Sequence, residues 1–478
     1  MKVITRFAPS PTGYIHIGNV RSAIYPYLLA RQTGGKLILR IEDTDQHRFV
    51  PGATELIIDT LQWLGLEWDE GPIVGGKNGP YYQSKRKSIY HDWAKKLLAC
   101  GRAYADPTPL EDIDKNRNLY YKNKTPFLYR NFRPKNPPAW KPGIPLRFKS
   151  EPKDYHWNDA VMGELNTGPE VIDDIILIKK DGLPTYNFAH IVDDTTMNIT
   201  HVMRGIEYIS STPNYLAIYE ALGVNRPCFV SLPHILAPSG NKKLGKRDGA
   251  KSVTEYRADG ILPETMLNYL ACLGWNDGTE QEIYTKQELI QKFSLDRIQS
   301  SGARYDENKL LWLNGQWIRK IYTEQGIDAL FARTLAFWPE NATSHAYQRQ
   351  VLSIIYDRLK TLSELKTFTT YFFTEPTIDL NMLTTNKFLK HFSKTELINL
   401  LETAYQTLLE LKTWDANSIQ ATLNSLLIST NTRPAELFSL IRIAISFAPF
   451  SPALHLTLHV LDRTRSLSRL KSVIKALS

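Results

Sequence analysis

The chain has 478 residues, of which 42% are apolar, so it is long enough to form about three packed domains. We expect no signal peptide and no membrane span, because a strand pattern follows the first residues at once and no run of about eighteen apolar residues occurs. The three cysteines lie far apart and predict free thiols in a reducing cytoplasm, and the net charge of +9 suits a polyanionic partner.

The first informative segment is residues 7–19 (FAPSPTGYIHIGN), which joins a short apolar run to a helical pattern. It predicts a strand, a tight turn and the start of a helix. Backbone N–H groups at a helix N-terminus attract an anion. His16 can donate a hydrogen bond to a phosphate oxygen there, and Gly18 allows a base or a phosphate to approach closely. A His-x-Gly tripeptide is also common in ordinary turns, so a second element has to support this interpretation.

Alternating strand and helix signals continue to about residue 100. Residues 36–41 (KLILRI) predict a buried strand, and residues 51–64 and 90–100 predict helices. From about 101 to 190 the pattern changes, because five prolines between positions 134 and 145 exclude a regular element there.

Residues 175–179 predict a strand near the end of this region. Strand and helix signals return from about 191 to 250, and the second informative segment lies at the end of that stretch. Residues 241–250 (NKKLGKRDGA) come after an apolar run at 229–237 and carry four cations within six residues. A charged loop is usually only solvated. This loop lies at the end of a predicted strand, where ligands bind in open α/β sheets. Its lysines can hold a polyphosphate and the charge that develops as pyrophosphate leaves.

The C-terminal part of the chain is predicted to be helical. Leucines recur at helical spacing at positions 359–365 and again, with Ile474, at 467–477. The last sixteen residues contain five cations and no acid. Such a stretch forms either a solvated helix face or a contact with a nucleic-acid phosphate backbone, and the sequence leaves both open.

The two informative segments together resemble the signatures of class I aminoacyl-tRNA synthetases. Residues 16–19 (HIGN) resemble the first signature, HIGH, and residues 243–247 (KLGKR) resemble the second, KMSKS. Further motifs narrow the resemblance to the bacterial glutamyl-tRNA synthetase family: residues 6–13 (RFAPSPTG), 39–45 (LRIEDTD), 184–188 (PTYNF), 200–205 (THVMRG) and 269–275 (YLACLGW). The match runs in order to about Arg319 and continues more weakly to the C-terminus.

The resemblance implies an α/β fold in which a Rossmann-like, doubly wound catalytic domain carries an inserted acceptor-end-binding domain and is followed by an all-α anticodon-binding half. The expected domains are 1–100 and 191–250 for catalysis, 101–190 for the insertion, 251–322 for a helical stem-contact domain and 323–478 for anticodon binding. The resemblance also implies a cytoplasmic enzyme, which we expect to be a monomer.

The implied reaction has two steps. Glutamate attacks the α-phosphorus of ATP to give glutamyl-adenylate and pyrophosphate, and the terminal adenosine hydroxyl of tRNA then takes the glutamyl group. Magnesium is expected to arrive with ATP. Neither step needs a protein nucleophile, so catalysis consists of positioning and of stabilising phosphate charge.

The resemblance also assigns site residues. Arg6 and Arg204 are the candidates for the carboxylate contacts, because a guanidinium binds a carboxylate with two hydrogen bonds. Glutamine would be rejected, because its amide cannot accept both bonds and would leave a buried arginine underpaired. The other expected glutamate contacts are Glu42 for the ammonium group, Ala8 and Ser10 in the adjoining turn, and Tyr186. The expected ATP-binding and catalytic residues are His16, Gly18, Lys243 and Lys246, with Glu207 on the ribose.

Some positions are ambiguous or depart from the family. Asp193 and Asp194 could suggest a metal site, but we interpret them as helix caps and expect no metal ligands. Ala105 and Asp106 stand where some relatives have zinc-binding cysteines, so we predict no zinc. Gly245 replaces the usual serine of the second signature, which removes a hydroxyl and adds backbone freedom.

Several alternatives stay open or are disfavoured. The enzyme could also charge glutamine tRNA, or the chain could be a catalytically impaired tRNA-binding paralogue with Gly245 as the symptom. Retention of His16, Lys243 and Lys246 argues against impairment. A glutaminyl enzyme is disfavoured by Arg6, by Glu42 and by the helical C-terminal half. The candidate tRNA contacts in that half are Arg442, Arg465 and Arg469.

Overall fold

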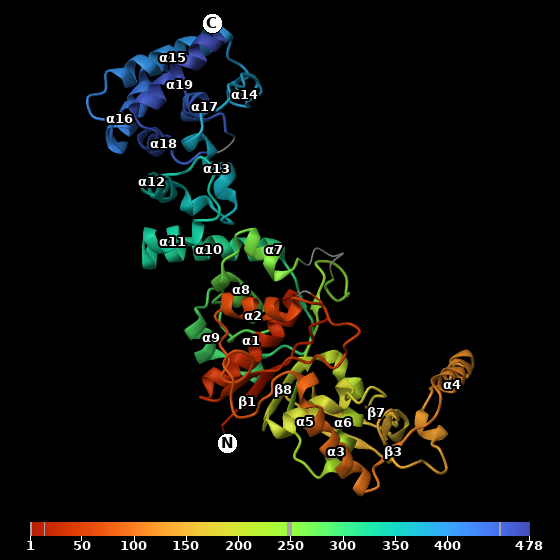
Figure 1. Cartoon of the computed structure of the whole chain (residues 1–478). Helices are drawn as coiled ribbons and strands as arrows, with labels where there is room; N and C mark the ends of the chain where they lie inside the picture. The colour runs from red at the N-terminus through yellow and green to blue at the C-terminus, as the bar shows by residue number, and fades with distance from the viewer. Residues whose placement is uncertain (1, 14, 246–250, 449–450) are drawn as a thin grey trace. The chain divides into compact units, whose positions relative to one another are not determined.

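The chain forms two compact units (Figure 1). The computed structural model describes residues 2–13, 15–245, 251–448 and 451–478. The first unit runs to Tyr256 and includes Pro263–Glu307, and the second comprises Arg257–Leu262 and Asn308–Ser478. Within these described stretches, no helix is both long and apolar enough to cross a membrane.

Parallel strands form the centre of the first unit. β1 pairs in parallel with β2, and β8 pairs in parallel with β9. The backbone N–H of Thr200 donates to the carbonyl of Ile4 at 2.8 Å, which places the start of β8 beside β1. β9 is extended by β5 and β6. The strands are β1 (Ile4–Phe7), β2 (Lys36–Leu39), β5 (Tyr155–Asp159), β6 (Gly163–Thr167), β8 (His201–Gly205), β9 (Cys228–Leu232), β10 (Ile235–Leu236) and β11 (Ala303–Arg304).

Helices cover these strands, which confirms the predicted α/β class. They are α1 (Ile17–Gln32), α2 (Ala53–Trp63), α3 (Lys87–Ala99), α5 (Tyr186–Thr196), α6 (Thr212–Leu222), α8 (Pro263–Cys272) and α9 (Lys286–Lys292). α2 and α3 correspond to the helices predicted at residues 51–64 and 90–100. In such a sheet ligands bind beyond the carboxyl ends of the strands, and the segments after β1 and β8 therefore frame the expected site.

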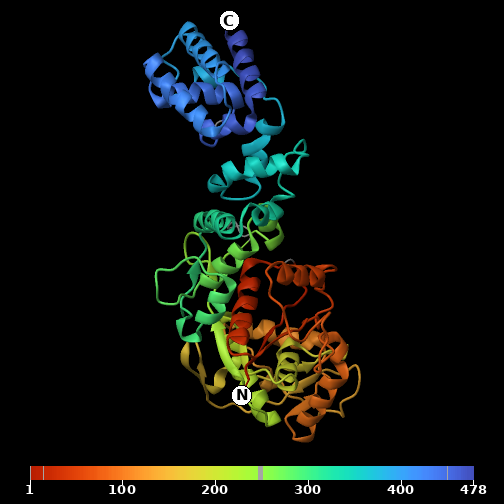
Figure 2. The same ribbon diagram turned by 90° about the vertical axis from the view of Figure 1, so that its left-hand side faces the viewer.

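The central helix α1 begins directly after the proline-rich turn. Its N-cap is His16, whose Nδ1 accepts a hydrogen bond from the backbone N–H of Gly18 at 3.1 Å. α1 packs against β1 as well as α8 and α9 (Figure 2). Val20, Ile24 and Leu28 are fully buried, and each contributes about 1.5–3 kcal/mol of hydrophobic stabilisation. The helix N-terminus is therefore held in a fixed position.

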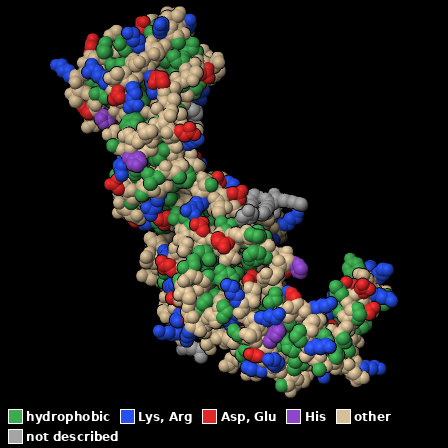
Figure 3. Space-filling view, viewed as in Figure 1, with side chains coloured by type: hydrophobic (Ala, Val, Ile, Leu, Met, Phe, Trp, Pro, Cys, Tyr) green, Lys and Arg blue, Asp and Glu red, His purple; other side chains and the backbone are tan. Residues whose placement is uncertain are grey.

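The inserted segment forms its own antiparallel sheet from β3 (Ala103–Ala105), β4 (Leu146–Phe148) and β7 (Ile176–Ile178), the last within the predicted strand at 175–179. The helix α4 (Leu110–Lys122), which our sequence patterns had not predicted, projects from this sheet and carries side chains of both charges (Figures 1 and 3). Asp106 accepts hydrogen bonds from Tyr129 at 2.8 Å and from Arg147 at 2.6 Å. Asp106 thus forms a buried ion pair with Arg147.

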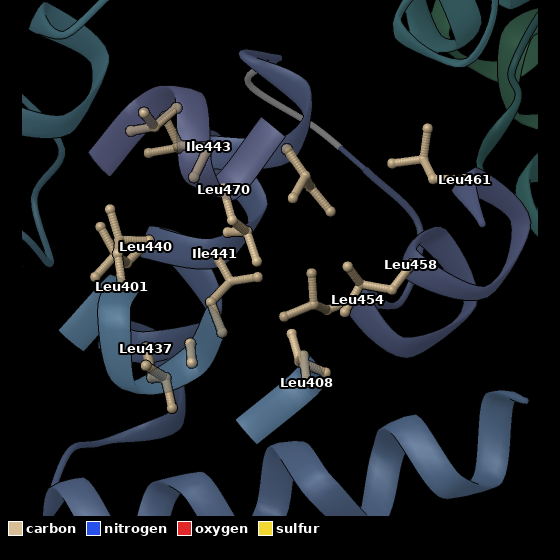
Figure 4. Packing of buried hydrophobic residues seen from close by; sticks show 14 of the residues in the cluster. Leu401, Leu408, Leu437, Leu440, Ile441, Ile443, Leu454, Leu458, Leu461 and Leu470 are labelled. Carbon is tan, nitrogen blue, oxygen red and sulfur yellow. The ribbon is translucent and has the colours of Figure 1, made fainter. Parts of the chain in front are cut away.

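The second unit is helical, as predicted. Leu401, Leu437, Ile441 and Leu470 meet in a continuous apolar core built from several helices (Figure 4). The helices are α7 (Val253–Ala258), which ends in this unit, α10 (Glu307–Gln325), α11 (Ile327–Thr334), α12 (His345–Ile355), α13 (Glu364–Phe373), α14 (Asn381–Thr384), α15 (Lys394–Leu409), α16 (Ala416–Thr430), α17 (Pro434–Ser446), α18 (Leu454–Leu461) and α19 (Arg463–Leu477).

The leucine spacing predicted one of the two helices correctly. The pattern at 467–477 lies in α19, whereas α13 begins only at Glu364, so Leu359 and Leu362 precede it. Both leucines are nonetheless buried. Apolar side chains that point into a core from a turn can imitate a helical spacing over such a short stretch.

Candidate active site

A cavity of about 270 Å³ opens at the carboxyl ends of β1 and β8, beside the N-terminus of α1. It brings together most of the residues predicted to form the site: Arg6, Ala8, Ser10, His16, Gly18, Glu42, Tyr186, Arg204, Glu207 and Lys243. These residues come from segments almost 240 positions apart in the sequence. Lys246 lies outside the described residues.

A buried ion-pair network forms one side of this site. Asp194 accepts from Arg6 Nε at 3.2 Å and from Arg40 Nη1 at 2.8 Å. Arg40 also contacts Glu42 at 2.9 Å and Asp193 at 3.6 Å, and Asp193 accepts from Arg86 at 2.7 Å. Three arginines therefore face three carboxylates. The neighbouring arginines hold the pKa of Asp194 well below its ordinary value in spite of burial.

Glu42, the candidate for the ammonium contact, is fixed by this network. Besides its ion pair with Arg40, it lies 3.4 Å from the Gln83 side-chain amide, and it is 5% exposed. Burial raises the pKa of Glu42, and the charges of Arg40 and Arg6 oppose that effect. Its carboxylate is thus held in one orientation at the cavity wall.

Arg204 differs from the other buried arginines. Its side chain is 8% exposed, and within the described residues neither Nη1 nor Nη2 has a hydrogen-bond partner. The guanidinium lies over the rings of Tyr208 at 5.0 Å and Tyr215 at 4.8 Å. Aromatic faces attract a cation, but they leave its N–H groups unsatisfied. The cavity therefore contains a buried cation that is suited to a bidentate anionic group.

The other end of the cavity combines a helix N-terminus with a lysine. The start of α1 presents His16 and Gly18, and a Cβ at Gly18 would lie 3.0 Å from the His16 ring. Lys243 Nζ lies 3.4 Å from Glu207 Oε1, and both side chains are about half exposed. His234 also approaches Glu207, at 3.7 Å. This end combines a helix N-terminus, which favours an anion, with a half-exposed lysine, and both features suit a polyphosphate.

Sequence reasoning missed the residues that support the site. Arg40 and Gln83 were not singled out. Asp193 and Asp194 were wrongly interpreted as helix caps, because they lie within α5 and bind arginines. Arg21 was also missed; it donates to the carbonyls of Leu273, at 3.0 Å, and Pro233. The available signal was a set of charges inside otherwise apolar segments, since such charges are almost always paired.

The three candidate tRNA contacts lie in the second unit, and their surroundings differ. Arg469 is 3% exposed and binds Glu375 at 3.0 Å and the Ile445 carbonyl at 2.7 Å, so we withdraw it as a phosphate contact. Arg465 binds Asp462 at 2.9 Å and the Phe372 carbonyl at 2.8 Å. Arg442 donates to Ser451 Oγ at 2.6 Å, and burial lowers its pKa.

Comparison with known proteins identifies the family of the chain. Residues 2–312 match the family described as tRNA synthetases class I (E and Q), catalytic domain, and residues 329–474 match an anticodon binding domain. The chain therefore belongs to the class I tRNA synthetases, in the family of the glutamate–tRNA ligases described next.

The similar proteins cover the whole chain. A glutamate–tRNA ligase of Dehalococcoides mccartyi is 38% identical over 100% of this chain and 98% of its own length. A glutamate–tRNA ligase of Chloroflexus aurantiacus is 38% identical over 99% of this chain and 98% of its own. The crystal structure of a glutamate tRNA ligase from Elizabethkingia meningosepticum, in complex with its amino acid, is 30% identical, with a TM-score of 0.89 over 100% of both chains.

Proposed function

We infer that this chain is an ATP-dependent ligase that joins L-glutamate to tRNA through a glutamyl-adenylate intermediate. A carboxylate oxygen of glutamate attacks the α-phosphorus of ATP and pyrophosphate leaves. The terminal adenosine hydroxyl of tRNA then attacks the activated carbonyl, and AMP leaves. The observation that carries the choice of glutamate is the buried Arg204 guanidinium, whose Nη atoms have no hydrogen-bond partner in the described chain.

The charges of the site favour an acidic amino acid. The network of Arg6, Arg40 and Arg86 with three carboxylates is balanced, so Arg204 is a surplus positive charge. Bound glutamate carries one net negative charge, whereas glutamine carries none. A site that hydrogen-bonds a particular substrate group can reject an analogue without that group by about 10⁴-fold, because its buried polar atoms stay unpaired. The cavity therefore selects a carboxylate over an amide.

The assigned roles follow from the positions of the groups. Arg204 and Arg6 receive the carboxylates, and Glu42 receives the ammonium group. Ala8, Ser10 and Tyr186 complete the amino-acid pocket as further lining residues. At the other end, His16, Gly18 and Lys243 hold the phosphates, and Glu207 holds the ribose. Lys246 lies outside the described residues, and only the resemblance of its loop to the second signature assigns it to the phosphates. Magnesium accompanies ATP and neutralises phosphate charge when bound.

The domain roles are proposed on the same basis. Residues 101–190 contact the acceptor end of tRNA, residues 251–322 its stem, and residues 323–478 its anticodon, and residues 1–100 with 191–250 carry out catalysis. The match of residues 329–474 to an anticodon binding domain supports the last assignment among the tRNA contacts. The predictions of a monomer, of a cytoplasmic location and of no structural zinc remain predictions.

The test is ATP–pyrophosphate exchange with glutamate or glutamine, with and without tRNA. We expect exchange with glutamate when tRNA is present, and exchange with glutamine that is weaker by about 10⁴-fold in kcat/KM. Aminoacylation of purified glutamate and glutamine tRNAs then separates a glutamate-specific enzyme from one that charges both tRNAs. Absence of exchange under every condition would instead favour the impaired, tRNA-binding paralogue.

A further inference from the structure

The helix α5 places three chemically distinct side chains on one face. Tyr186, His190 and Asp194 are spaced four residues apart, so they follow one another along the helix. Tyr186 lines the cavity, and Asp194 belongs to the ion-pair network. His190 stands between them and is 1% exposed. Neither the sequence patterns nor the reaction assigns it a role.

The contacts of His190 connect it to both arginines of the amino-acid pocket. Its ring lies 4.5 Å from the Tyr215 ring, edge to face, and the Arg204 guanidinium lies over the same ring at 4.8 Å. On its other side, His190 Nδ1 is 3.8 Å from Asp194 Oδ2, which is longer than a hydrogen bond. In the part of the chain that is described, both ring nitrogens and this carboxylate oxygen lack hydrogen-bond partners.

We propose that His190 is a specificity-determining residue, whose neutral imidazole separates Asp194 from Arg204 and so preserves Arg204 as the uncompensated cation that selects a carboxylate. The proposal rests on the proposed function. Asp194 approaches the His190 ring, and its other oxygen already binds Arg6 and Arg40. The imidazole lies against both Asp194 and the Tyr215 ring without supplying a negative charge.

The surroundings of His190 keep it neutral. Burial lowers the pKa of His190 to about 3, the positive charges of Arg204 and Arg6 act in the same direction, and Asp194 opposes them. Tyr186 and Tyr215 are the other titratable groups against its ring. A carboxylate at position 190 would bring a further negative charge to the Tyr215 ring that Arg204 covers, and it would offset the surplus charge of the cavity.

The matched variants His190→Asn and His190→Asp test this proposal, because they differ in charge and hardly in size. The assay is ATP–pyrophosphate exchange with tRNA present, measured separately for glutamate and glutamine. For His190→Asp we expect kcat/KM for glutamate to fall by about 30-fold or more, with a much smaller change for glutamine and for the KM of ATP. For His190→Asn we expect the glutamate-to-glutamine preference to stay within about threefold of the wild type.

Two results would overturn the proposal: equal loss of glutamate use in both variants, or an unchanged preference in His190→Asp. Urea unfolding shows whether each variant folds. If His190→Asp does not fold, His190→Phe supplies a second neutral replacement. A retained preference in both neutral variants supports the role as a neutral spacer, and a lost preference in either refutes it. A wild-type protein that activates no amino acid would refute the proposed function itself, which distinguishes that failure from a failure at His190.

Discussion

Replacement of Arg204 by alanine should abolish the use of glutamate and leave ATP binding intact. Each hydrogen bond between a guanidinium and a carboxylate contributes about 1.5–3 kcal/mol. Two such bonds give about 3–6 kcal/mol, which corresponds to about 10²- to 10⁴-fold in kcat/KM for glutamate. Arg204 contacts aromatic rings and, within the described residues, no carboxylate lies within ion-pair distance of it. Its removal therefore leaves no buried acid unpaired.

The same geometry predicts a small effect of Arg204→Ala on stability. The variant loses cation–π contacts, which contribute about 0.5–2 kcal/mol, and gains from the removal of a buried charge without a counter-ion. We expect the free energy of unfolding to change by less than about 2 kcal/mol. Exchange assays report glutamate use, calorimetric titration reports ATP affinity, and urea unfolding reports stability. Loss of ATP binding, or glutamate use within a few-fold of the wild type, would refute the assignment.

Three further predictions follow from the buried charges and the second signature. Arg40→Met should destabilise the protein by about 3–5 kcal/mol in urea unfolding, because three carboxylates lose a shared partner; a change below 1 kcal/mol would contradict the network. The unfolded chain protonates His190 near pH 6.5, but the folded chain does so only near its pKa of about 3, so stability falls as the pH falls through this window. Between pH 7 and pH 5 this loss is about 2 kcal/mol, and His190→Asn should remove it from urea unfolding curves; equal losses in both proteins would contradict it. Gly245→Ser should speed adenylate formation a few-fold, because it restores a hydroxyl and reduces backbone freedom. Single-turnover measurement of adenylate formation tests this, and an unchanged rate would show that the glycine does not slow the reaction.

Local sequence patterns predicted alternating strands and helices and the segments that surround the cavity, whereas the fold class came from the resemblance to a family. The proline-rich turn before His16 and the charged loop around Lys243 could be recognised because turns, helix starts and strand ends have strong local signals. The resemblance to a family then supplied the residues between them, such as Tyr186 and Arg204. Ten of the residues predicted for the site line one cavity.

Pairing between distant charges could not be predicted in the same way. Asp194 and Arg6 are 188 positions apart, and no local pattern indicates which acid neutralises which arginine. The helix-cap interpretation of Asp193 and Asp194 was wrong for this reason, since it considered only their neighbours in sequence. Arg469 shows the same limit at the C-terminus: in the sequence it is one of several cations, but in the fold it binds Glu375 and is buried.

The arrangement of charges separates stability from selectivity. Arg6, Arg40 and Arg86 are neutralised within the protein, so the folded state does not depend on a ligand to compensate them. Arg204 has no such partner among the described residues, and its burial without a counter-ion costs folding free energy that the carboxylate of the proposed substrate would recover. A protein with a carboxylate beside Arg204 would be more stable when empty and less able to distinguish glutamate from glutamine. In its proposed role, His190, which lies against Asp194 and against the Tyr215 ring that Arg204 covers, decides which of these two properties the site has.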